Sequence, residues 1–395
     1  MYFIFQIFLF ILLLPTLLSW QANFKHIGAL VSDPLESSPL YFQNHLYIMQ
    51  SEMGNFPPDN QPHSFFCIFD GLTGNKIICP NSSVGYAFFS AIVDHTSSVE
   101  TIWVFGSNWD RAQSHAPGCQ PWGCGSCAQV ASGNQSANCL IGAWKTTDLI
   151  NFIGPINIIA LPTNITVPNV GVGMVNRPSS IPPPGNLPAH QAFMALEAGM
   201  PNHNGHFIAI NTGNDYNLFT NWVLLNISEY SISGNVGEAS GCPSARYNPK
   251  DGYYYVMGGG NMVDLTRSNN LTSGSWTLAP NHIEIGCTYQ LENCSIGTNI
   301  ARIAPNYYTN YWINGSDHNR REFLNNLTLW QYSVNDVDFC DDTVGNTYFL
   351  YGTCAQTAPA NFTGKAGNFY QLGIYSGLEG DWLNSYFTNT TDEIK

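Results

Sequence analysis

The chain is poor in charge, and positive charge is especially scarce. Its 395 residues include 13 Lys and Arg against 27 Asp and Glu, which gives a formal net charge of −14. Nucleic acids and anionic membranes are bound by basic surfaces, so the composition argues against both as partners. Disordered chains are rich in charge and poor in apolar residues. Here only 10% of residues are charged and 44% are hydrophobic, so we expect a large folded core.

Long hydrophobic runs are absent from the rest of the chain once the first twenty residues are passed. No later stretch approaches the ~18 apolar residues that span a bilayer. Residues 2–18 are apolar at all but three positions, and no Lys or Arg precedes Lys25. This run resembles the apolar region of a secretory signal, with the small Ser19 near a cleavage point. We predict a signal peptide at 1–19 and a mature domain at 20–395; an uncleaved N-terminal anchor is the alternative.

Glycosylation sequons agree with secretion. An Asn-x-Ser/Thr sequon marks an acceptor for an N-linked glycan on a surface loop of a secreted protein. Ten sequons are spread over the whole chain, which predicts a glycoprotein that is extracellular or in the endolysosomal lumen. They begin at Asn81, Asn134, Asn164, Asn226, Asn270, Asn293, Asn314, Asn326, Asn361 and Asn389.

The 11 cysteines are expected to form disulfides, since an oxidising compartment favours them. Close spacing suggests the pairs Cys67–Cys79 and Cys287–Cys294. An odd number leaves at least one thiol unpaired within the chain, and Cys242, distant from the others, is our candidate. Two further bridges, or alternatively a zinc site, are expected from the group Cys119, Cys124, Cys127 and Cys139.

Helical periodicity is also missing. Short runs rich in Val, Ile, Tyr, Phe and Trp alternate with Gly, Asn, Pro, Ser and Asp, a pattern typical of antiparallel strands. One clear hairpin spans 242–257, where Asn-Pro-Lys-Asp-Gly at 248–252 provides the turn.

After each hairpin comes a similar third-strand segment with a polar turn, a Leu and then Trp or Phe, for example at 144–152, 211–222, 266–276 and 375–382. Repeats of this kind predict an all-β, five-bladed β-propeller; an irregular β-sandwich or barrel is the alternative. We place the five units at about 21–85, 86–155, 156–230, 231–285 and 286–395, within one domain.

The openings of two units carry a family resemblance. ESSPLYF at 36–42 precedes LYIM at 46–49, and GCPSARY at 241–247 precedes GYYYV at 252–256. With the third-strand segments, this pattern resembles the five-bladed propeller glycoside hydrolases of the arabinanase, xylosidase and invertase superfamily. The resemblance implies a funnel where each blade's innermost strand begins. It also implies three carboxylates from different blades, serving as base or nucleophile, pKa modulator and acid. Two of them, one ionised and one protonated, would flank the glycosidic bond.

The family's catalytic motifs are altered in this chain. Its first-blade Asp-Pro aligns with Ser38-Pro39, its second-blade Asp-Pro has no counterpart in 87–91, and its acid Glu aligns with Gly241. Either the carboxylates occupy other positions, or the activity is lost or different.

Four acidic residues are our catalytic candidates. Glu36 opens the first inner strand, where it serves as a base or binds a sugar hydroxyl. Asp336 and Asp338 alternate with apolar residues on the strand opening the last unit, a costly placement unless they are bonded or functional. Glu197 ends the apolar run FMALE, whose surroundings favour a protonated carboxyl suited to a general acid. Structural hydrogen bonding or a solvated position is the alternative for each.

Three further residues are predicted to bind substrate. Arg246 and Tyr247 lie on the fourth inner strand, where an arginine can pair with a channel acid or a substrate oxygen. Trp109 is a candidate for stacking on a sugar ring; a core position is its alternative. The histidines form no metal-ligand spacing, and we expect no metal and no cofactor.

The sequence therefore supports two hypotheses. The first is a secreted glycosidase-like protein that hydrolyses O-glycosidic bonds in a poly- or oligosaccharide. The second is a non-catalytic propeller that binds carbohydrate or protein, which the altered motifs favour.

Overall fold

The structure is a computed structural model. The residues it describes fall into several ranges separated by gaps, and all structural statements concern these ranges: 24–32, 37–56, 61–71, 73, 75–108, 140–161, 170–175, 186–197, 206–232, 243–258, 264–279, 334–354, 368–375 and 378–388.

The described strands form five antiparallel sheets. The first sheet has the order β2 (Ser37–Phe42), β3 (His45–Phe56), β4 (Gln61–Asp70) and β5 (Lys76–Ile78). After the short 3₁₀ helix η1 (Asn81–Ser83), the second has the order β6 (Ala87–Asp94), β7 (Thr101–Ser107), β8 (Leu140–Thr146) and β9 (Ile153–Ala160).

The remaining sheets follow the same scheme. The third comprises β10 (Val170–Met174), β11 (Ala192–Glu197), β12 (His206–Asn211) and β13 (Trp222–Leu224), with β14 (Ser231–Ile232) also paired to β12. The fourth comprises β15 (Ser244–Asn248), β16 (Tyr253–Gly258), β17 (Asp264–Ser268) and β18 (Thr277–Leu278). The fifth comprises β19 (Val334–Asp341), β20 (Thr347–Cys354), β21 (Asn368–Tyr375) and β1 (Phe24–Ser32).

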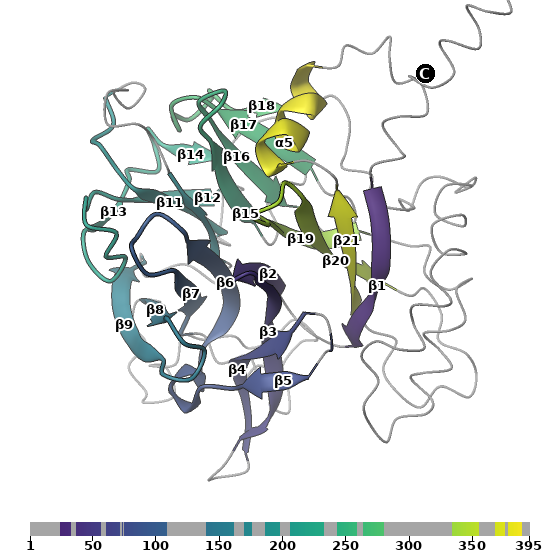
Figure 1. Cartoon of the computed structure of the whole chain (residues 1–395). Coiled ribbons are helices and arrows are strands. Elements are labelled where there is room, and N and C mark those ends of the chain that lie inside the picture. Colours follow the sequence, from purple (N-terminus) through teal and green to yellow (C-terminus); the bar gives the residue numbers. More distant parts are fainter. Residues whose placement is uncertain are drawn as a thin grey trace, which may run out of the picture.

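The first strands of the five sheets form a closed ring. Each inner strand contacts the next: β2 contacts β6, β6 contacts β10, β10 contacts β15, β15 contacts β19, and β19 contacts β2 (Figure 1). Five sheets radiating from a central ring of strands are the blades of a β-propeller. The structure thus confirms the predicted all-β, five-bladed propeller, and we number the blades 1 to 5 in the order of their inner strands.

The boundaries of the blades differ from those of the predicted units at one strand, β1. β1 lies within the segment assigned to the first unit, but it pairs antiparallel with β21 as the outermost strand of blade 5 (Figure 1). Blade 5 is therefore built from both ends of the chain. This pairing covers an edge that would otherwise expose unpaired backbone groups.

The core lies between adjacent blades. Three clusters of buried apolar side chains fill the spaces between blades 1 and 2, 2 and 3, and 3 and 4. Aromatic rings dominate the first, where Phe66, Phe89 and Trp144 meet edge to face with centroids 5.1–5.8 Å apart. Ala91 and Ile92 are neighbours on β6 but belong to the first and second clusters, so the two faces of this inner strand pack against blades 1 and 3.

The third-strand segments owe their similarity to a shared turn. In blade 2, the Thr146 hydroxyl accepts from the Leu149 N–H at 3.0 Å; in blade 4, the Ser268 hydroxyl accepts from the Leu271 N–H at 3.0 Å. Both leucines are buried and have positive φ, 59° and 61°. Hydrogen bonds from the Asn151 backbone and side chain hold the pKa of Asp148 in this turn well below its usual range.

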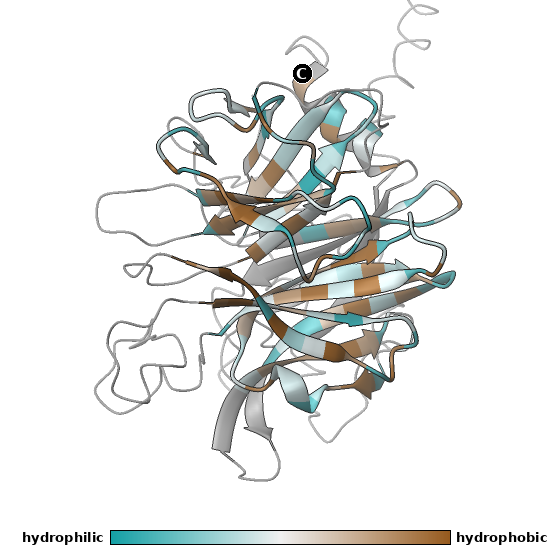
Figure 2. Cartoon of the chain, turned by 90° about the vertical axis from the view of Figure 1, so that its left-hand side faces the viewer, coloured by the Kyte–Doolittle hydropathy of each residue, from teal (hydrophilic) through white to brown (hydrophobic). Residues whose placement is uncertain are grey.

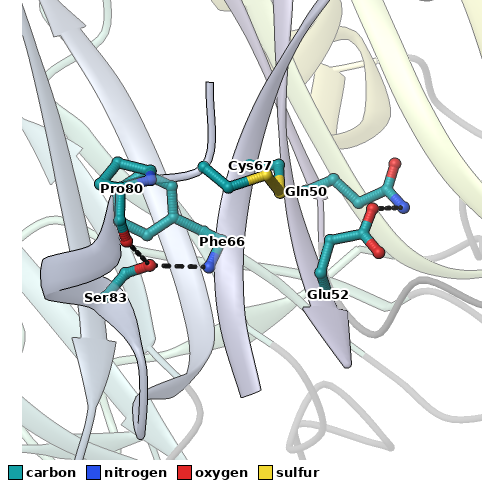
Figure 3. Close-up of a disulfide and its surroundings, with 7 residues drawn as sticks. Gln50, Glu52, Phe66, Cys67, Pro80 and Ser83 are labelled. Carbon is teal, nitrogen blue, oxygen red and sulfur yellow. Dashed lines mark hydrogen bonds between the residues drawn. A yellow bond between two sulfur atoms is a disulfide. The ribbon is translucent and has the colours of Figure 1, made fainter. Parts of the chain in front are cut away.

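The predicted disulfide Cys67–Cys79 is present and ties β4 to the segment after β5 (Figure 3). The other proposed cysteine pairs, the alternative zinc group and Cys242 lie outside the described residues.

A helix follows the third strand of blade 5. The segment 375–382 was expected to contain a polar turn with Leu378 and then Trp382, and α5 (Glu379–Thr388) begins within it. Gly380, Leu383, Asn384 and Phe387 have the i, i+3, i+4, i+7 spacing of one helix face. This face docks on blade 4, where the Arg267 guanidinium lies 4.1 Å from the Phe387 ring centroid and donates to Asn384 Oδ1 at 3.2 Å. Tertiary contact thus stabilises the helix.

The β19–β20 turn gives a pH-dependent prediction. Burial tends to raise the pKa of Asp342, but hydrogen bonds from Asn346 and from the Val344 N–H outweigh it and lower the pKa. The stabilisation is therefore present above the unfolded-state pKa of about 3.9 and is lost as the pH falls through the lower folded-state value.

We expect Asp342→Asn to reduce the free energy of unfolding at pH 7 by about 1–2 kcal/mol. Urea unfolding should show that this difference from wild type starts to shrink below about pH 4, where the unfolded wild-type protein becomes protonated, and disappears once the folded state is protonated as well. A difference that stays constant from pH 7 to pH 3 would contradict the ionised role of Asp342.

Candidate functional site: the central channel

The inner strands run in the same direction along the channel. A Cβ added to Gly171 would meet the Pro243 carbonyl, and one added to Gly173 would lie 2.7 Å from the Ala245 carbonyl oxygen. Position 171 therefore matches 243 and position 173 matches 245, which makes β10 and β15 parallel neighbours at close approach. The channel has one end where the inner strands begin, called here the entry end, and one where they finish, called the exit end.

A cavity of about 200 Å³ lies toward the exit end. Residues from all five inner strands or the turns that follow them line it: Pro39, Tyr41, Ala91, Ile92, Val93, His95, Met174, Arg246, Phe339, Cys340 and Asp341. The expected funnel lies at the entry end, so this cavity is not the predicted location.

The middle of the channel holds a buried ion pair. Arg246 Nη2 lies 2.6 Å from Asp338 Oδ1, and both side chains are about nine-tenths buried. Arg246 also donates to the carbonyls of Ala245 (2.7 Å), Val172 (3.4 Å) and Phe339. Its guanidinium lies 4.5 Å from the Phe339 ring centroid. One arginine thus joins the inner strands of blades 3, 4 and 5, and the predicted pairing of Arg246 with a channel acid is present.

The two oxygens of Asp338 have different surroundings. Oδ1 accepts hydrogen bonds from Ser244 Oγ at 2.7 Å, Arg246 Nη2 at 2.6 Å and the Phe339 N–H at 2.9 Å. Among the residues that the structure describes, none donates a hydrogen bond to Oδ2. The charge-assisted contact with Arg246 is therefore made through Oδ1 alone, and Oδ2 has no donor in the described part of the chain.

A second available polar group comes from blade 1. Ser37 alternates with Pro39 and Tyr41 on β2, so it lies on the same strand face as these two cavity-lining residues, nearer the entry end. Ser37 is 5% exposed, and its Oγ has no hydrogen-bond partner in the described part of the chain. Leaving a hydroxyl buried without a partner costs about 1–3 kcal/mol, which a ligand hydroxyl would offset.

Two further acidic side chains lie toward the entry end. Glu197 ends β11 one residue beyond the pairing of Leu196 with Val170, the first residue of β10. Glu52 lies two residues beyond Gln50, which pairs with Ser37 at the start of β2. Both are half-buried, and Glu52 Oε1 accepts from Gln50 Nε2 at 3.0 Å (Figure 3).

The structure does not place the other predicted site residues in the channel. Tyr247 lies in the apolar cluster between blades 3 and 4, with its ring 5.0 Å from that of Tyr254, so it faces the core rather than the channel. Asp336 falls in the irregular part of β19 between Asn335 and Asp338, and its side chain is outside the described set. Glu36 and Trp109 lie outside the described residues.

Sequence reasoning missed Ser37, Ser244 and Glu52. The serines belong to the SSPLY and CPSAR openings that carried the family resemblance, so their alternation with Pro39 and Arg246 was a usable signal. Nothing in the sequence marked Glu52, because its position depends on how far β3 extends beyond the start of β2.

Neither a metal centre nor a membrane-spanning helix is found in the described ranges. No three His, Cys, Asp or Glu side chains of these ranges gather closely enough to hold a metal ion. In the same ranges, no helix has the length and apolar character needed to cross a bilayer.

Comparison with solved structures gives similarities to glycoside hydrolases. A xylan β-1,4-xylosidase from Bacillus halodurans C-125 matches 88% of this chain at 12% identity and a TM-score of 0.49. A GH43_12 protein from a capybara gut metagenome matches 89% at 12% identity and a TM-score of 0.45. The catalytic domain of a Coprinopsis cinerea GH62 α-L-arabinofuranosidase matches 90% at 8% identity and a TM-score of 0.47, with 96% of that domain covered.

This chain spans about half the length of the first two structures, 54% and 53%. No family model matches the chain. No curated protein matches it either. At these identities the similarity concerns the propeller architecture alone.

Proposed function

We propose that this chain is a secreted glycoside hydrolase that cleaves an O-glycosidic bond of a poly- or oligosaccharide at the entry end of the propeller channel. One observation carries the proposal: Asp338 Oδ1 is bonded to Arg246, Ser244 and the Phe339 N–H, and no residue that the structure describes donates to its Oδ2. Glycoside hydrolysis needs such a carboxylate as base or nucleophile, together with a second carboxyl that donates a proton to the leaving oxygen.

Glu197 is our proposed proton donor. It follows the buried segment of β11 and is half-buried at the entry end, the same end at which Ser244, the first residue of β15, contacts Asp338. The two carboxyl groups come from blades 3 and 5, so a sugar at the channel mouth would lie between them. Glu36 and Asp336 stay candidates for a third carboxylate.

Ser37 and Ser244 are proposed to orient the sugar. The Ser37 hydroxyl is buried and has no hydrogen-bond partner among the described residues. The Ser244 hydroxyl donates to Asp338 Oδ1. Hydroxyl groups at this depth are suited to hydrogen bonds with the hydroxyls of a neutral sugar, which the acidic chain would not repel.

Secretion is part of the proposal. The apolar segment at residues 2–18 and the ten sequons point to the secretory route. The Cys67–Cys79 disulfide adds support, because such bonds persist in oxidising compartments.

The direct test is turnover by the purified protein on a panel of aryl glycosides and polysaccharides. The panel should include xylosides and arabinofuranosides, the substrates implied by the names of the similar structures. We expect Asp338→Asn and Glu197→Gln each to lower kcat about 100-fold or more, the range for loss of an acid–base group. Asp381→Asn, on the outer surface at α5, is the matched control and should keep full activity.

A second candidate function is carbohydrate binding without cleavage. It is favoured by the three hydrogen bonds on Asp338 Oδ1, an arrangement also found in carboxylates that only join strands. Sugar binding without turnover across the panel would establish this function and overturn the hydrolase. Turnover that survives Asp338→Asn would place the chemistry elsewhere.

A further inference from the structure

The rim between blades 2 and 3 exposes large apolar side chains. Ile153 is 56% exposed and Ile156 41% exposed on β9, the last strand of its sheet. β9 contacts β13, where Trp222 and Leu224 are only half-buried. We call these four residues the rim patch; the strands that carry them, β9 and β13, lie at the left of Figure 1, the side that faces the viewer in Figure 2. An outer strand with exposed apolar side chains is a site for self-association.

The four side chains face a common space. Ile156 pairs with Ala143 and Ile153 with Lys145 across the β8–β9 ladder. Ala143 belongs to the apolar cluster between blades 2 and 3, and Trp222 and Leu224 pack against the same cluster from blade 3. The rim patch is therefore the outer continuation of this core, left uncovered by protein within the described residues.

A sequon begins at Asn226, two residues after the end of β13. Asn226 is exposed and lies between Leu224 and Ile227, both of which pack against the cluster beneath the rim patch. Its Oδ1 accepts from the Ser228 N–H at 3.2 Å and from Ser228 Oγ at 3.0 Å, while Nδ2 donates to Glu229 Oε1 at 3.2 Å. An N-linked glycan would leave one N–H on Nδ2 and both lone pairs on Oδ1, so the turn can keep these bonds.

We infer that Asn226 carries an N-linked glycan that covers the rim patch and prevents it from pairing with a second copy of the chain. The inference rests on the proposed secretory route but not on the proposed hydrolysis. In the modification, Nδ2 forms a bond to the anomeric carbon of an oligosaccharide. The bond from that carbon to a lipid diphosphate donor breaks, and an amide proton leaves with the diphosphate.

The full chain, expressed in a eukaryotic secretory host, provides the test. Glycopeptide mass spectrometry should find Asn226 modified. Sedimentation velocity should show that Asn226→Gln shifts the protein toward twice the mass of the wild-type species. Ser228→Ala, which removes the sequon but keeps Asn226, should behave in the same way.

Two controls separate the glycan from the loss of a side chain. Asn270→Gln removes a sequon on blade 4, where Asn270 Oδ1 accepts hydrogen bonds from the N–H and the hydroxyl of Thr272, as Asn226 Oδ1 does from Ser228. This variant should sediment as the same oligomeric species as wild type, lighter only by the missing glycan. Adding Ile153→Thr and Ile156→Thr to Asn226→Gln should restore wild-type sedimentation.

The inference is overturned if Asn226 is unmodified, or if both sequon variants sediment as wild type does. An unmodified Asn226 beside a glycosylated Asn270 would overturn this inference alone. Absence of glycans at every sequon would also overturn the secretory route. Neither result bears on turnover, so failure here is distinguishable from failure of the proposed hydrolase.

Discussion

Arg246→Met is expected to lower the free energy of unfolding by about 3–5 kcal/mol, because it leaves Asp338 as an unpaired charge in the channel. Methionine keeps most of the volume of the arginine stem, so the loss reports on charge and hydrogen bonding rather than on a large cavity. Urea unfolding at neutral pH measures the difference.

The chain contains a matched control for this variant. Lys250 and Asp381 form an ion pair of nearly equal length, 2.7 Å against 2.6 Å, but their side chains are 55% and 56% exposed. Lys250→Met should cost no more than about 1 kcal/mol, since water screens an exposed pair. Equal losses for Arg246→Met and Lys250→Met would contradict the buried-pair account.

The double variant Arg246→Met with Asp338→Leu separates pairing from burial. Removing both charges should recover most of the stability lost in Arg246→Met, because the desolvation penalty of both ions is removed together. It should also abolish the proposed activity. A stable but inactive double variant would show that the pair serves the site rather than the fold.

Gly171→Ala is the second substitution with a large expected effect, a loss of about 3 kcal/mol or more. The added methyl group would collide with the Pro243 carbonyl and lie 3.2 Å from Ser244 Cα. These atoms belong to the backbone of β15, so relief requires the two inner strands to separate. The displacement would also move Ser244 and Arg246 away from Asp338.

Gly274→Ala is the control for this substitution. Gly274 has φ of +83° and no atoms within 4 Å of the added methyl group, so only backbone strain of about 1–2 kcal/mol is expected. Thermal or urea unfolding of both variants should rank Gly171→Ala as the more damaging. The reverse order would mean that β10 and β15 are not closely packed.

The fold was largely predictable because its signals are local. Strand alternation, the turn at 248–252 and the repeated turn around Leu149 and Leu271 are set by residues close in sequence. Two features required long-range contacts. β1 joins β21 across the whole chain, and α5 forms where its apolar face meets Arg267 and neighbouring groups of blade 4.

The candidate site was predictable in part. Alternation placed Arg246 and Asp338 on inner strands, and their pairing follows from the adjacency of blades 4 and 5 in the ring. The position of Tyr247 in the core follows from the same alternation, since it is the neighbour of a channel-facing arginine. Glu52 could not be found in this way, because its place depends on the register of β3 against β2.

The central claim is that a sugar binds at the entry end of the channel, against Asp338. The most direct measurement is a crystal structure of the Asp338→Asn variant soaked with an oligosaccharide from the substrate panel. We expect a sugar oxygen within about 2.6–3.2 Å of the side chain at position 338, with a second hydroxyl at Ser37. A sugar bound only in the exit-end cavity beside Tyr41 and Asp341, or on the outer surface, would contradict the account.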